Sequence, residues 1–429
     1  MKKMIRIIKE KDKLNYLNEL QSRNSQDFND VYDIVDNILE DVRKNKDSAI
    51  KRYTNEFDKV SLDNLEVSIE EIEEAYNTIN KDLLDTLIKS KDNIEDYHKK
   101  QMRKGYKYKP EGKDLILGQI INPIEKAGIY VPGGKASYPS TVLMNAIPAK
   151  IAGVKEIIMI TPPQENGKIK DSILVAASIA GVDRIFKVGG AQGIAALAYG
   201  TESIPKVNKI TGPGNIFVAA AKRRVSGFVG IDMIAGPSEI LIIADEMANP
   251  AYIAADMISQ AEHDEMAASI LITDSISLIK KVKNELKNQV NILERSEIIK
   301  KSLQNNGAII LADSIKECID LANEIAPEHL ELLTVNCFYI YKNIKNAGAI
   351  FLGEYSPEPV GDYFAGPNHT LPTSSTSKFS SALSVDDFIK KTSLIYYSKD
   401  SLQEYKEDII RFAENEGLTA HANAIKIRT

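Results

Sequence analysis

The chain has 429 residues, more than one hydrophobic core normally serves, so we expect two or more domains. Its formal net charge of −6 argues against nucleic-acid binding, which needs Lys and Arg gathered at phosphates. The only cysteines, Cys318 and Cys337, form no C-x-x-C pair, which excludes a thiolate zinc site and argues against a disulfide framework. No uncharged stretch reaches membrane-spanning length and the amino terminus lacks the apolar core of a signal peptide, so we expect a cytoplasmic protein with no membrane partner.

The first quarter of the chain is predicted to be helical. Ser68 and Glu71 have the spacing of a capping box, which marks the start of a helix. An earlier amphipathic helix is indicated by apolar residues that recur every three or four positions, the spacing of one helix face. These residues are Phe28, Val31, Ile34, Val35 and Ile38.

From residue 115 onward, short apolar runs alternate with segments long enough to form a helix. This alternation is typical of βα repeats, which build a mostly parallel sheet, and it occurs in two successive sets. The first set of predicted strands is 115–117, 128–131, 157–160, 184–188 and 209–210. The second set is 239–244, 268–273, 308–311, 330–334 and 349–352, with helices predicted at 251–261, 277–290, 315–325 and 401–416. The Ser-rich segment 372–381 is expected to be an exposed loop.

Glycine clusters lie where three predicted strands of the first set end, at residues 132–134, 189–193 and 212–215. Glycine at a strand-to-helix junction lets backbone N–H groups approach an anion, and the helix amino end adds favourable partial charge. Open α/β sheets bind ligands at the carboxyl ends of their strands. None of the clusters is a G-x-G-x-x-G, but three in one βα domain predict a nucleotide or another phosphate-bearing cofactor.

Four of the five histidines stand in short polar stretches: His263, His329, His369 and His421. Imidazole titrates near neutral pH and is the commonest metal ligand. If the helix predicted at 251–261 runs slightly further, Gln260 and His263 lie three residues apart on one face. Asp362 and His421 could complete a site whose nitrogen and oxygen donors suit zinc. The alternative is that Gln260 caps a helix and His263 is an exposed cation.

Glu328 and His329 follow Pro327 directly. Proline disfavours helix in the residue before it, so the helix ending near Ile325 should deliver this pair into a loop. A carboxylate beside an imidazole supplies two proton acceptors of different basicity, which suits a reaction that needs a base more than once. The alternative is a solvated loop pair without a catalytic role.

These stretches together resemble the histidinol dehydrogenase family, from about residue 128 to residue 421. The blocks that carry the resemblance are 128–134, 138–153, 188–201, 212–215, 235–239, 260–263, 327–331, 362–372 and 416–418 with His421. The resemblance implies a zinc-dependent homodimer that oxidises L-histidinol to L-histidine through L-histidinaldehyde with NAD. These oxidations are the last steps of histidine biosynthesis.

The resemblance also implies a role for each candidate residue. One Zn²⁺ per subunit would be held by Gln260, His263, Asp362 and His421, with His421 coming from the carboxyl-terminal tail of the partner subunit. His329 would be the general base for alcohol oxidation, and Glu328 would activate water for aldehyde oxidation. Tyr130, Gln192 and Asn215 would contact NAD, while Ser238, His369 and Glu416 would line the histidinol pocket together with the metal ligands and His329.

The fold class implied is α/β, with two Rossmann-like βα domains, mostly parallel sheets, a helical N-terminal region and a C-terminal helical arm. The expected domains are an N-terminal helical arm at 1–22, an NAD-binding domain at 128–239, a larger discontinuous α/β domain at 23–127 and 240–383 with the metal and catalytic residues, and an arm at 384–429 that reaches the partner subunit.

Three other functions stay open from the residues. A related NAD-dependent dehydrogenase could use this scaffold on another small alcohol, but without an amine on its substrate it would not need Glu416. A zinc hydrolase using Glu328 as base would leave the three glycine clusters without a cofactor. A non-catalytic binding protein would tolerate loss of Glu328, His329 or a metal ligand, and all of these are present.

Overall fold

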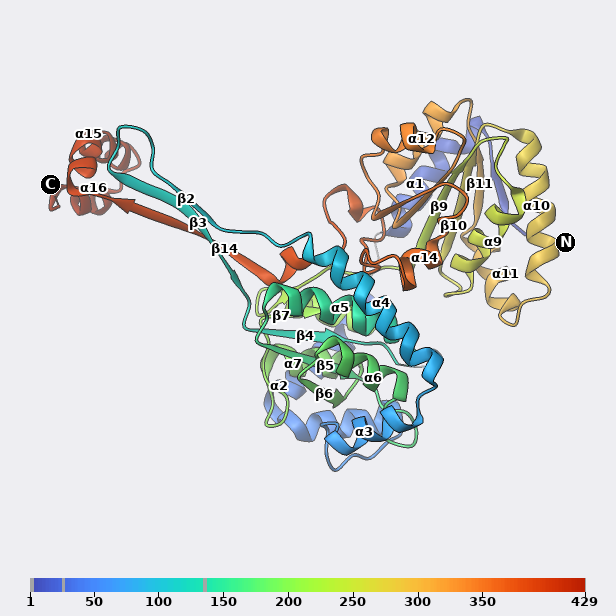
Figure 1. Cartoon of the computed structure of the whole chain (residues 1–429), viewed down its shortest axis with the longest axis horizontal. Helices are drawn as coiled ribbons and strands as arrows, with labels where there is room; N and C mark the ends of the chain where they lie inside the picture. The colour runs from blue at the N-terminus through green and yellow to red at the C-terminus, as the bar shows by residue number, and fades with distance from the viewer. Residues whose placement is uncertain (1–3, 25–27, 134–136, 429) are drawn as a thin grey trace.

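The computed structural model describes residues 4–24, 28–133 and 137–428, so part of the glycine cluster at 132–134 lies outside the described residues. The chain forms two lobes and a long arm, with the carboxyl terminus at the tip of the arm (Figure 1). Each lobe is built around a parallel sheet, which confirms the predicted α/β class. Among the described residues, no helix has the length and apolar character needed to cross a membrane.

The first lobe contains a five-stranded parallel sheet with the order β6-β5-β4-β7-β8. Its inner strands are buried on both faces, because helices cover the sheet from each side. The strand order reverses between β4 and β7, the position at which doubly wound sheets bind ligands. The strands are β4 (Lys126–Tyr130), β5 (Glu156–Thr161), β6 (Arg184–Lys187), β7 (Lys209–Thr211) and β8 (Gly230–Ile231), and the connecting helices are α5 (Pro139–Ala152), α6 (Asp171–Ala180), α7 (Gly190–Tyr199) and α8 (Ile216–Val225).

The helices α2 (Asn29–Asp58), α3 (Ile69–Thr78) and α4 (Lys81–Lys99) pack on this same lobe. The apolar stripe of α2 shares a core with α7 and α8, while α3 and α4 share a core with α5 and α6. This packing differs from the expected grouping of 23–127 with 240–383, because an apolar stripe specifies a buried face without specifying which sheet it covers. Ser68 and Glu71 do form the predicted capping box at the start of α3.

The second lobe contains a six-stranded parallel sheet with the order β1-β11-β10-β9-β12-β13. Its edge strand β1 (Arg6–Ile8) comes from the amino terminus, where only helix was predicted, and is followed by α1 (Lys13–Asn24). The five strands predicted from the second set are all confirmed. They are β9 (Glu239–Ala244), β10 (Ala268–Thr273), β11 (Ala308–Leu311), β12 (His329–Leu333) and β13 (Ala349–Leu352), with helices α9 (Pro250–Ala261), α10 (Ile276–Val290), α11 (Ser296–Asn305), α12 (Ile315–Ile325), α13 (Cys337–Ile340) and α14 (Glu358–Tyr363).

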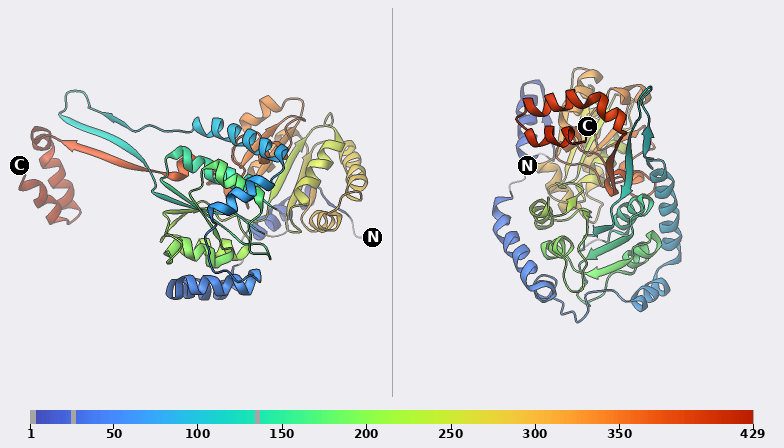
Figure 2. Two further views of the ribbon diagram at one scale, coloured as in Figure 1. Left: turned by 60° about the horizontal axis from the view of Figure 1, so that its bottom comes forward. Right: turned by 90° about the vertical axis from the view of Figure 1, so that its left-hand side faces the viewer.

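The arm is an antiparallel ribbon that ends in two helices. The strands β3 (Leu115–Pro123) and β14 (Ile389–Tyr397) pair along their whole length, and β2 (Tyr106–Tyr108) pairs with β3. The ribbon carries α15 (Lys399–Asn415) and α16 (Thr419–Lys426) away from both lobes (Figures 1 and 2). The expected C-terminal arm is therefore present, but half of its stalk is a strand that the sequence pattern did not predict.

The Ser-rich segment 372–381 is only partly exposed, so the expectation of an exposed loop is wrong for its first half. Thr373 is 2% exposed and its Oγ1 accepts a hydrogen bond of 2.6 Å from the N–H of Gly236. Ser375 and Ser377 donate to the carbonyl oxygens of Ile325 and Ala326. These hydroxyl groups face the protein because they bond to backbone groups of the connections that lead into β9 and β12.

Candidate active site

A cleft of about 1130 Å³ opens at the carboxyl edge of the five-stranded sheet. Tyr130, Gln192 and Asn215, the three residues expected to contact NAD, all line it. Tyr130 is the last residue of β4, Gln192 lies in the first turn of α7, and Asn215 precedes α8. This volume is slightly above the range of about 300–1,000 Å³ that small-molecule sites usually span, so the cleft can hold an extended ligand.

The backbone at this edge makes close approaches that only glycine allows. Gly212 has φ +111°, and a Cβ atom there would lie 2.1 Å from the carbonyl oxygen of Tyr130. The Tyr130 hydroxyl in turn accepts a hydrogen bond of 3.2 Å from the N–H of Gly190. Asn215 caps α8 by accepting from the N–H groups of Phe217 and Val218, so part of its role is structural.

A buried ion pair holds the Gly212 turn from behind. The Asp232 carboxylate accepts a hydrogen bond of 2.8 Å from the N–H of Gly212, and Lys222 Nζ donates one of 2.9 Å to the carbonyl oxygen of Gly212. Lys222 and Asp232 also form an ion pair, and their side chains are 3% and 1% exposed. Both backbone polar groups of the turn are therefore satisfied by one charged pair.

A second group of polar residues lies at the amino edge of the six-stranded sheet. His329 is the first residue of β12 and pairs in register with Ile240 of β9, so the pair does not lie wholly in a loop as expected. Glu328 and His329 are 6% and 4% exposed, which rules out a solvated pair. The backbone of Glu239 fixes both: its N–H donates to Glu328 Oε2 at 2.8 Å, and its carbonyl oxygen lies 3.0 Å from His329 Nδ1.

The electrostatics of this pair follow from its burial. Burial raises the pKa of Glu328 to about 8, although the neighbouring His329 opposes the shift. Burial alone would lower the pKa of His329, but the carboxylates of Glu328 and Asp362 outweigh it and raise this pKa to about 10. His329 Nδ1 lies 3.6 Å from Glu328, and its Nε2 lies 3.8 Å from Asp362 Oδ1. The raised pKa of His329 means that the imidazole holds its proton between the carboxylates of Glu328 and Asp362, where little water reaches.

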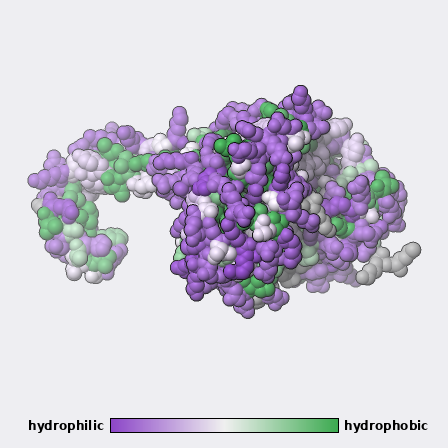
Figure 3. Space-filling model, turned by 90° about the horizontal axis from the view of Figure 1, so that it is seen from below, coloured by the Kyte–Doolittle hydropathy of each residue, from purple (hydrophilic) through white to green (hydrophobic). Residues whose placement is uncertain are grey.

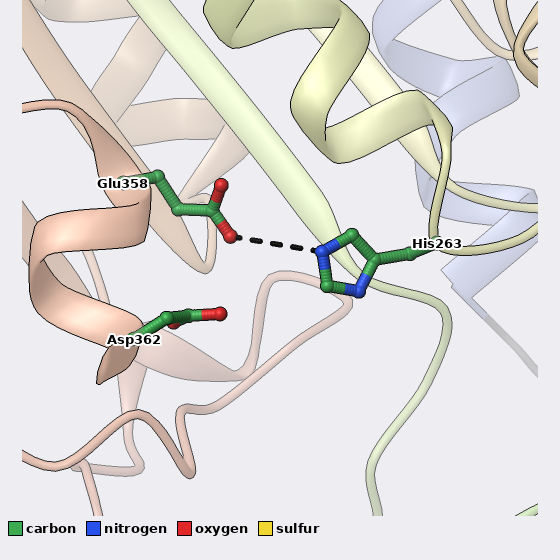
Figure 4. A group of neighbouring side chains, drawn as sticks. All are labelled: His263, Glu358 and Asp362. Atoms are coloured by element: carbon green, nitrogen blue, oxygen red, sulfur yellow. Dashed lines mark ion pairs between the residues drawn. The ribbon is translucent and has the colours of Figure 1, made fainter. Parts of the chain in front are cut away.

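His263, Glu358 and Asp362 offer ligand atoms that all lie within 4.8 Å of one another (Figure 4). Glu358 and Asp362 are four residues apart on α14 and face the same side, toward His263. Glu358 was not among the predicted residues, although its spacing from Asp362 was a readable signal. Its backbone N–H donates to Glu331 Oε1 at 2.8 Å, which anchors the amino end of α14 on β12.

Gln260 lies one turn before His263 and is completely buried. Within the part of the chain that the structure describes, neither its Oε1 nor its Nε2 has a hydrogen-bond partner. A buried amide without a partner costs free energy, so this side chain is suited to a ligand that completes it. Its amide, the His263 imidazole and the carboxylates of Glu358 and Asp362 are nitrogen and oxygen donors of the kinds that zinc accepts.

Of the remaining predicted residues, His369 lies at this group, whereas Glu416 and His421 do not. His369 Nδ1 is 3.0 Å from the carbonyl oxygen of Asp362, while Ser238 lies in the connection that leads into β9. Glu416 and His421 lie on the helices at the end of the arm, far from both lobes of their own chain (Figure 1). One chain alone therefore assembles only part of the predicted site.

A buried proton acceptor and a ligand cleft at the switch point of a Rossmann-like sheet are what a nicotinamide-linked oxidoreductase requires. The comparison with protein families agrees with this class. The family model described as histidinol dehydrogenase matches residues 21–429. The chain belongs to the histidinol dehydrogenase family, and it is therefore an NAD-dependent oxidoreductase that acts on histidinol in histidine biosynthesis.

Individual relatives are similar over their whole length. The chain is 55% identical to the histidinol dehydrogenase of Clostridium acetobutylicum, with 100% of both chains covered. It is 54% identical to that of Caldanaerobacter subterraneus, covering 100% of this chain and 99% of the relative. The crystal structure of histidinol dehydrogenase from Elizabethkingia anophelis has a TM-score of 0.93 at 39% identity, covering 99% of this chain and 98% of the other.

Proposed function

We propose that this enzyme carries out the four-electron oxidation of L-histidinol to L-histidine through L-histidinaldehyde, with NAD as hydride acceptor and one Zn²⁺ per subunit. The observation that carries the proposal is the buried Glu328–His329 pair beside Asp362, in a chain of this family. A zinc hydrolase would leave the cleft at the other sheet without a ligand. A non-catalytic protein would have no need to bury two titratable groups at such cost.

Gln260, His263 and Asp362 would hold the zinc ion, together with His421 of the partner subunit. The unpartnered amide of Gln260 and the mutual approach of His263 and Asp362 support this ligand set. Bound there, the ion would hold the imidazole and amine of histidinol and so orient its carbinol carbon. Ser238, His369 and Glu416 are proposed to line the same substrate pocket.

His329 is proposed to take the alcohol proton. Its Nδ1 lies at hydrogen-bond distance from the carbonyl oxygen of Glu239, so in the neutral ring Nδ1 carries the proton and Nε2 is the acceptor. Nε2 has no hydrogen-bond partner among the described residues and lies 3.8 Å from Asp362 Oδ1. The carboxylates raise the pKa of the ring to about 10, so the ring must lose its proton before it can act as a base; a zinc ion on Asp362 would favour that loss, because its charge opposes the effect of the carboxylates. The Nδ1 contact also fixes the orientation of the ring.

Glu328 is proposed to activate the water that adds to the aldehyde in the second oxidation. One of its oxygens is held by the N–H of Glu239, which orients the carboxylate. Its raised pKa, about 8, makes the ionised carboxylate a stronger base than one in water. Two acceptors of different basicity thus serve the two successive oxidations.

We also propose that two chains exchange their arms, so that each arm completes the other chain's site. Exposed apolar side chains on the arm support this, because such patches mark interaction surfaces (Figure 3). Glu416 and His421 line a cavity within this apolar region. The exposed apolar residues of the arm include Ile395, Tyr396, Phe412, Leu418 and Ile427.

The proposed domains follow from these roles. Residues 128–239 would bind NAD, 240–383 would carry the metal and catalytic residues, and 384–429 would reach the partner subunit. The helices α2, α3 and α4 pack on the helices that cover the five-stranded sheet, so we propose that they belong with the NAD-binding unit. The strand β1 pairs with β11, so the amino-terminal arm would belong to the other unit.

The reaction is tested by counting NADH formed per L-histidinol consumed. Two NADH per histidine formed is the expected result, whereas one NADH with accumulating aldehyde would refute the four-electron assignment. A related dehydrogenase of another alcohol would leave histidinol unconsumed.

The exchanged arm is tested by mixing two inactive variants, His329→Asn and His421→Ala, after joint unfolding and refolding. Random pairing makes half of the dimers mixed, and one of the two sites in each mixed dimer has both residues intact, so about one quarter of wild-type activity should return. Each variant refolded alone is the control. No recovery in the mixture, with dimers demonstrated, would show that each chain supplies its own His421.

A further inference from the structure

The NAD cleft contains an acid that the sequence analysis did not name. Asp58 is the last residue of α2, outside the βα units of the sheet, and it lines the cleft together with Tyr130 and Gln192. Its Oδ2 atom is buried and has no hydrogen-bond partner in the described ranges 4–24, 28–133 and 137–428. Burial raises the pKa of Asp58 to about 6, and no cation offsets that effect. Asp58 thus lines the cleft with one carboxylate oxygen that no described protein group satisfies.

Two neighbouring polar groups, those of Lys59 and Tyr130, do not donate a hydrogen bond to this carboxylate. The Lys59 ammonium donates a hydrogen bond to the carbonyl oxygen of Glu56. Burial, and to a smaller extent the charge of Asp58, raises the pKa of the Tyr130 hydroxyl, which accepts a hydrogen bond from the N–H of Gly190. A buried acceptor left without a donor destabilises the folded protein, and a bound ligand with hydroxyl donors would remove that cost.

The position fits the ribose of a dinucleotide. In Rossmann-like folds an acidic residue near the end of the second strand usually binds the ribose hydroxyls. Here β5 ends at Thr161 and is followed by two prolines, and Glu165 beyond them is exposed. Glu165 also lines the cleft, but it is exposed, so water can satisfy its charge, whereas Asp58 brings to the same cleft from α2 a carboxylate with a buried, unpartnered oxygen.

Part of the cleft wall is apolar, as an adenine ring requires. The apolar side chains come from α2 and from the segment that leads into and begins α6, a segment that also contributes Gln164, Asn166 and Lys170 to the lining. None of the proposed proton acceptors or metal ligands lines this cleft. The adenosine half of the dinucleotide therefore fits here better than the nicotinamide half. The apolar wall residues are Ile34, Ile38, Phe57, Ile169 and Ile173.

We propose that Asp58 accepts hydrogen bonds from the adenosine ribose diol of NAD and repels the 2′-phosphate of NADP, so that it determines the choice between the two dinucleotides. This inference rests on the proposed NAD-linked function. A carboxylate suits two neighbouring hydroxyl donors, and the same negative charge disfavours a phosphate at that position.

The test is titration calorimetry of the full-length enzyme with NAD and with NADP, for wild type and Asp58→Asn. Asn keeps the shape of the side chain and removes its charge, so NAD binding should weaken about 10-fold while NADP binding strengthens. The Kd for NADP divided by the Kd for NAD should therefore fall at least 10-fold. Glu56→Gln is the matched control, since it removes an exposed charge from the same helix, and its ratio should equal that of wild type.

An unchanged ratio in Asp58→Asn, or a ratio that shifts in Glu165→Gln instead, would overturn the assignment. If Asp58→Asn does not fold, Asp58→Ser gives the same comparison with a smaller side chain. Wild-type protein that binds neither dinucleotide and forms no NADH from histidinol would refute the proposed function itself. Wild-type protein that reduces NAD, with an unchanged ratio in the variant, would refute only the role of Asp58.

Discussion

The buried ion pair of Lys222 and Asp232 holds the turn at Gly212, so we expect a substitution in this pair to lower the free energy of unfolding strongly. Replacing Asp232 by Asn keeps an acceptor for the N–H of Gly212 but leaves the Lys222 ammonium, 3% exposed, without its counter-charge. Breaking a buried pair in this way costs about 3–5 kcal/mol, because the remaining charge is neither solvated nor neutralised. At about 2–4 °C per kcal/mol for a unit of 150–250 residues, we expect the unfolding temperature of this lobe to fall by about 6–20 °C.

The assay is urea and thermal unfolding followed by far-ultraviolet circular dichroism, since the chain contains no tryptophan for fluorescence. The double variant Lys222→Met with Asp232→Asn removes both charges, so it should recover at least half of the lost free energy of unfolding. Two results would refute the reasoning: a loss below about 1 kcal/mol in Asp232→Asn, or a double variant whose loss equals the sum of the two single losses.

Three further predictions concern the site and the thiols. Glu328→Gln and His329→Asn should each lower turnover about 10²–10⁴-fold, the usual contribution of a general base, with NAD affinity unchanged; wild-type turnover in either variant would contradict the assignment. Chelation should abolish activity and added Zn²⁺ should restore it, whereas full activity in metal-free protein would contradict the ligand set. Burial raises the pKa of Cys318 to about 12, so its reactive thiolate is disfavoured at pH 8, and Cys337 is also buried and therefore shielded from reagents. An aromatic disulfide reagent should modify neither thiol in native protein and both in urea; rapid labelling of native protein would show that the thiols are accessible.

The resemblance of short sequence blocks identified the family, and local patterns predicted most of the two sheets. Apolar runs separated by helix-length segments are read within a few residues of each other, so the strands β5, β6 and β9 were predictable from their own sequence. The glycine clusters were equally local, because a positive φ or a close backbone approach excludes side chains at the glycine itself.

Other features were not predictable because they depend on which distant segments meet. The strand β14 lies between a loop and a helix without a distinctive pattern, and it is a strand only because β3, far earlier in the chain, pairs with it. Likewise the apolar stripe of α2 predicted a buried helix face but not which sheet the helix covers. Long-range pairing and packing are decided by the whole chain, so a window of sequence does not contain them.

The candidate site divides in the same way. The sequence by itself determined which donor groups are available, since imidazole, amide and carboxylate groups such as those of Gln260, His263 and Asp362 have their donor properties wherever they lie. Only the tertiary structure decided that Glu358 faces His263, that Glu328 is buried, and that Asp58 lines the cleft at the five-stranded sheet. Proximity and burial set the pKa of a group and leave a polar atom satisfied or not, and both arise only when separate elements pack together.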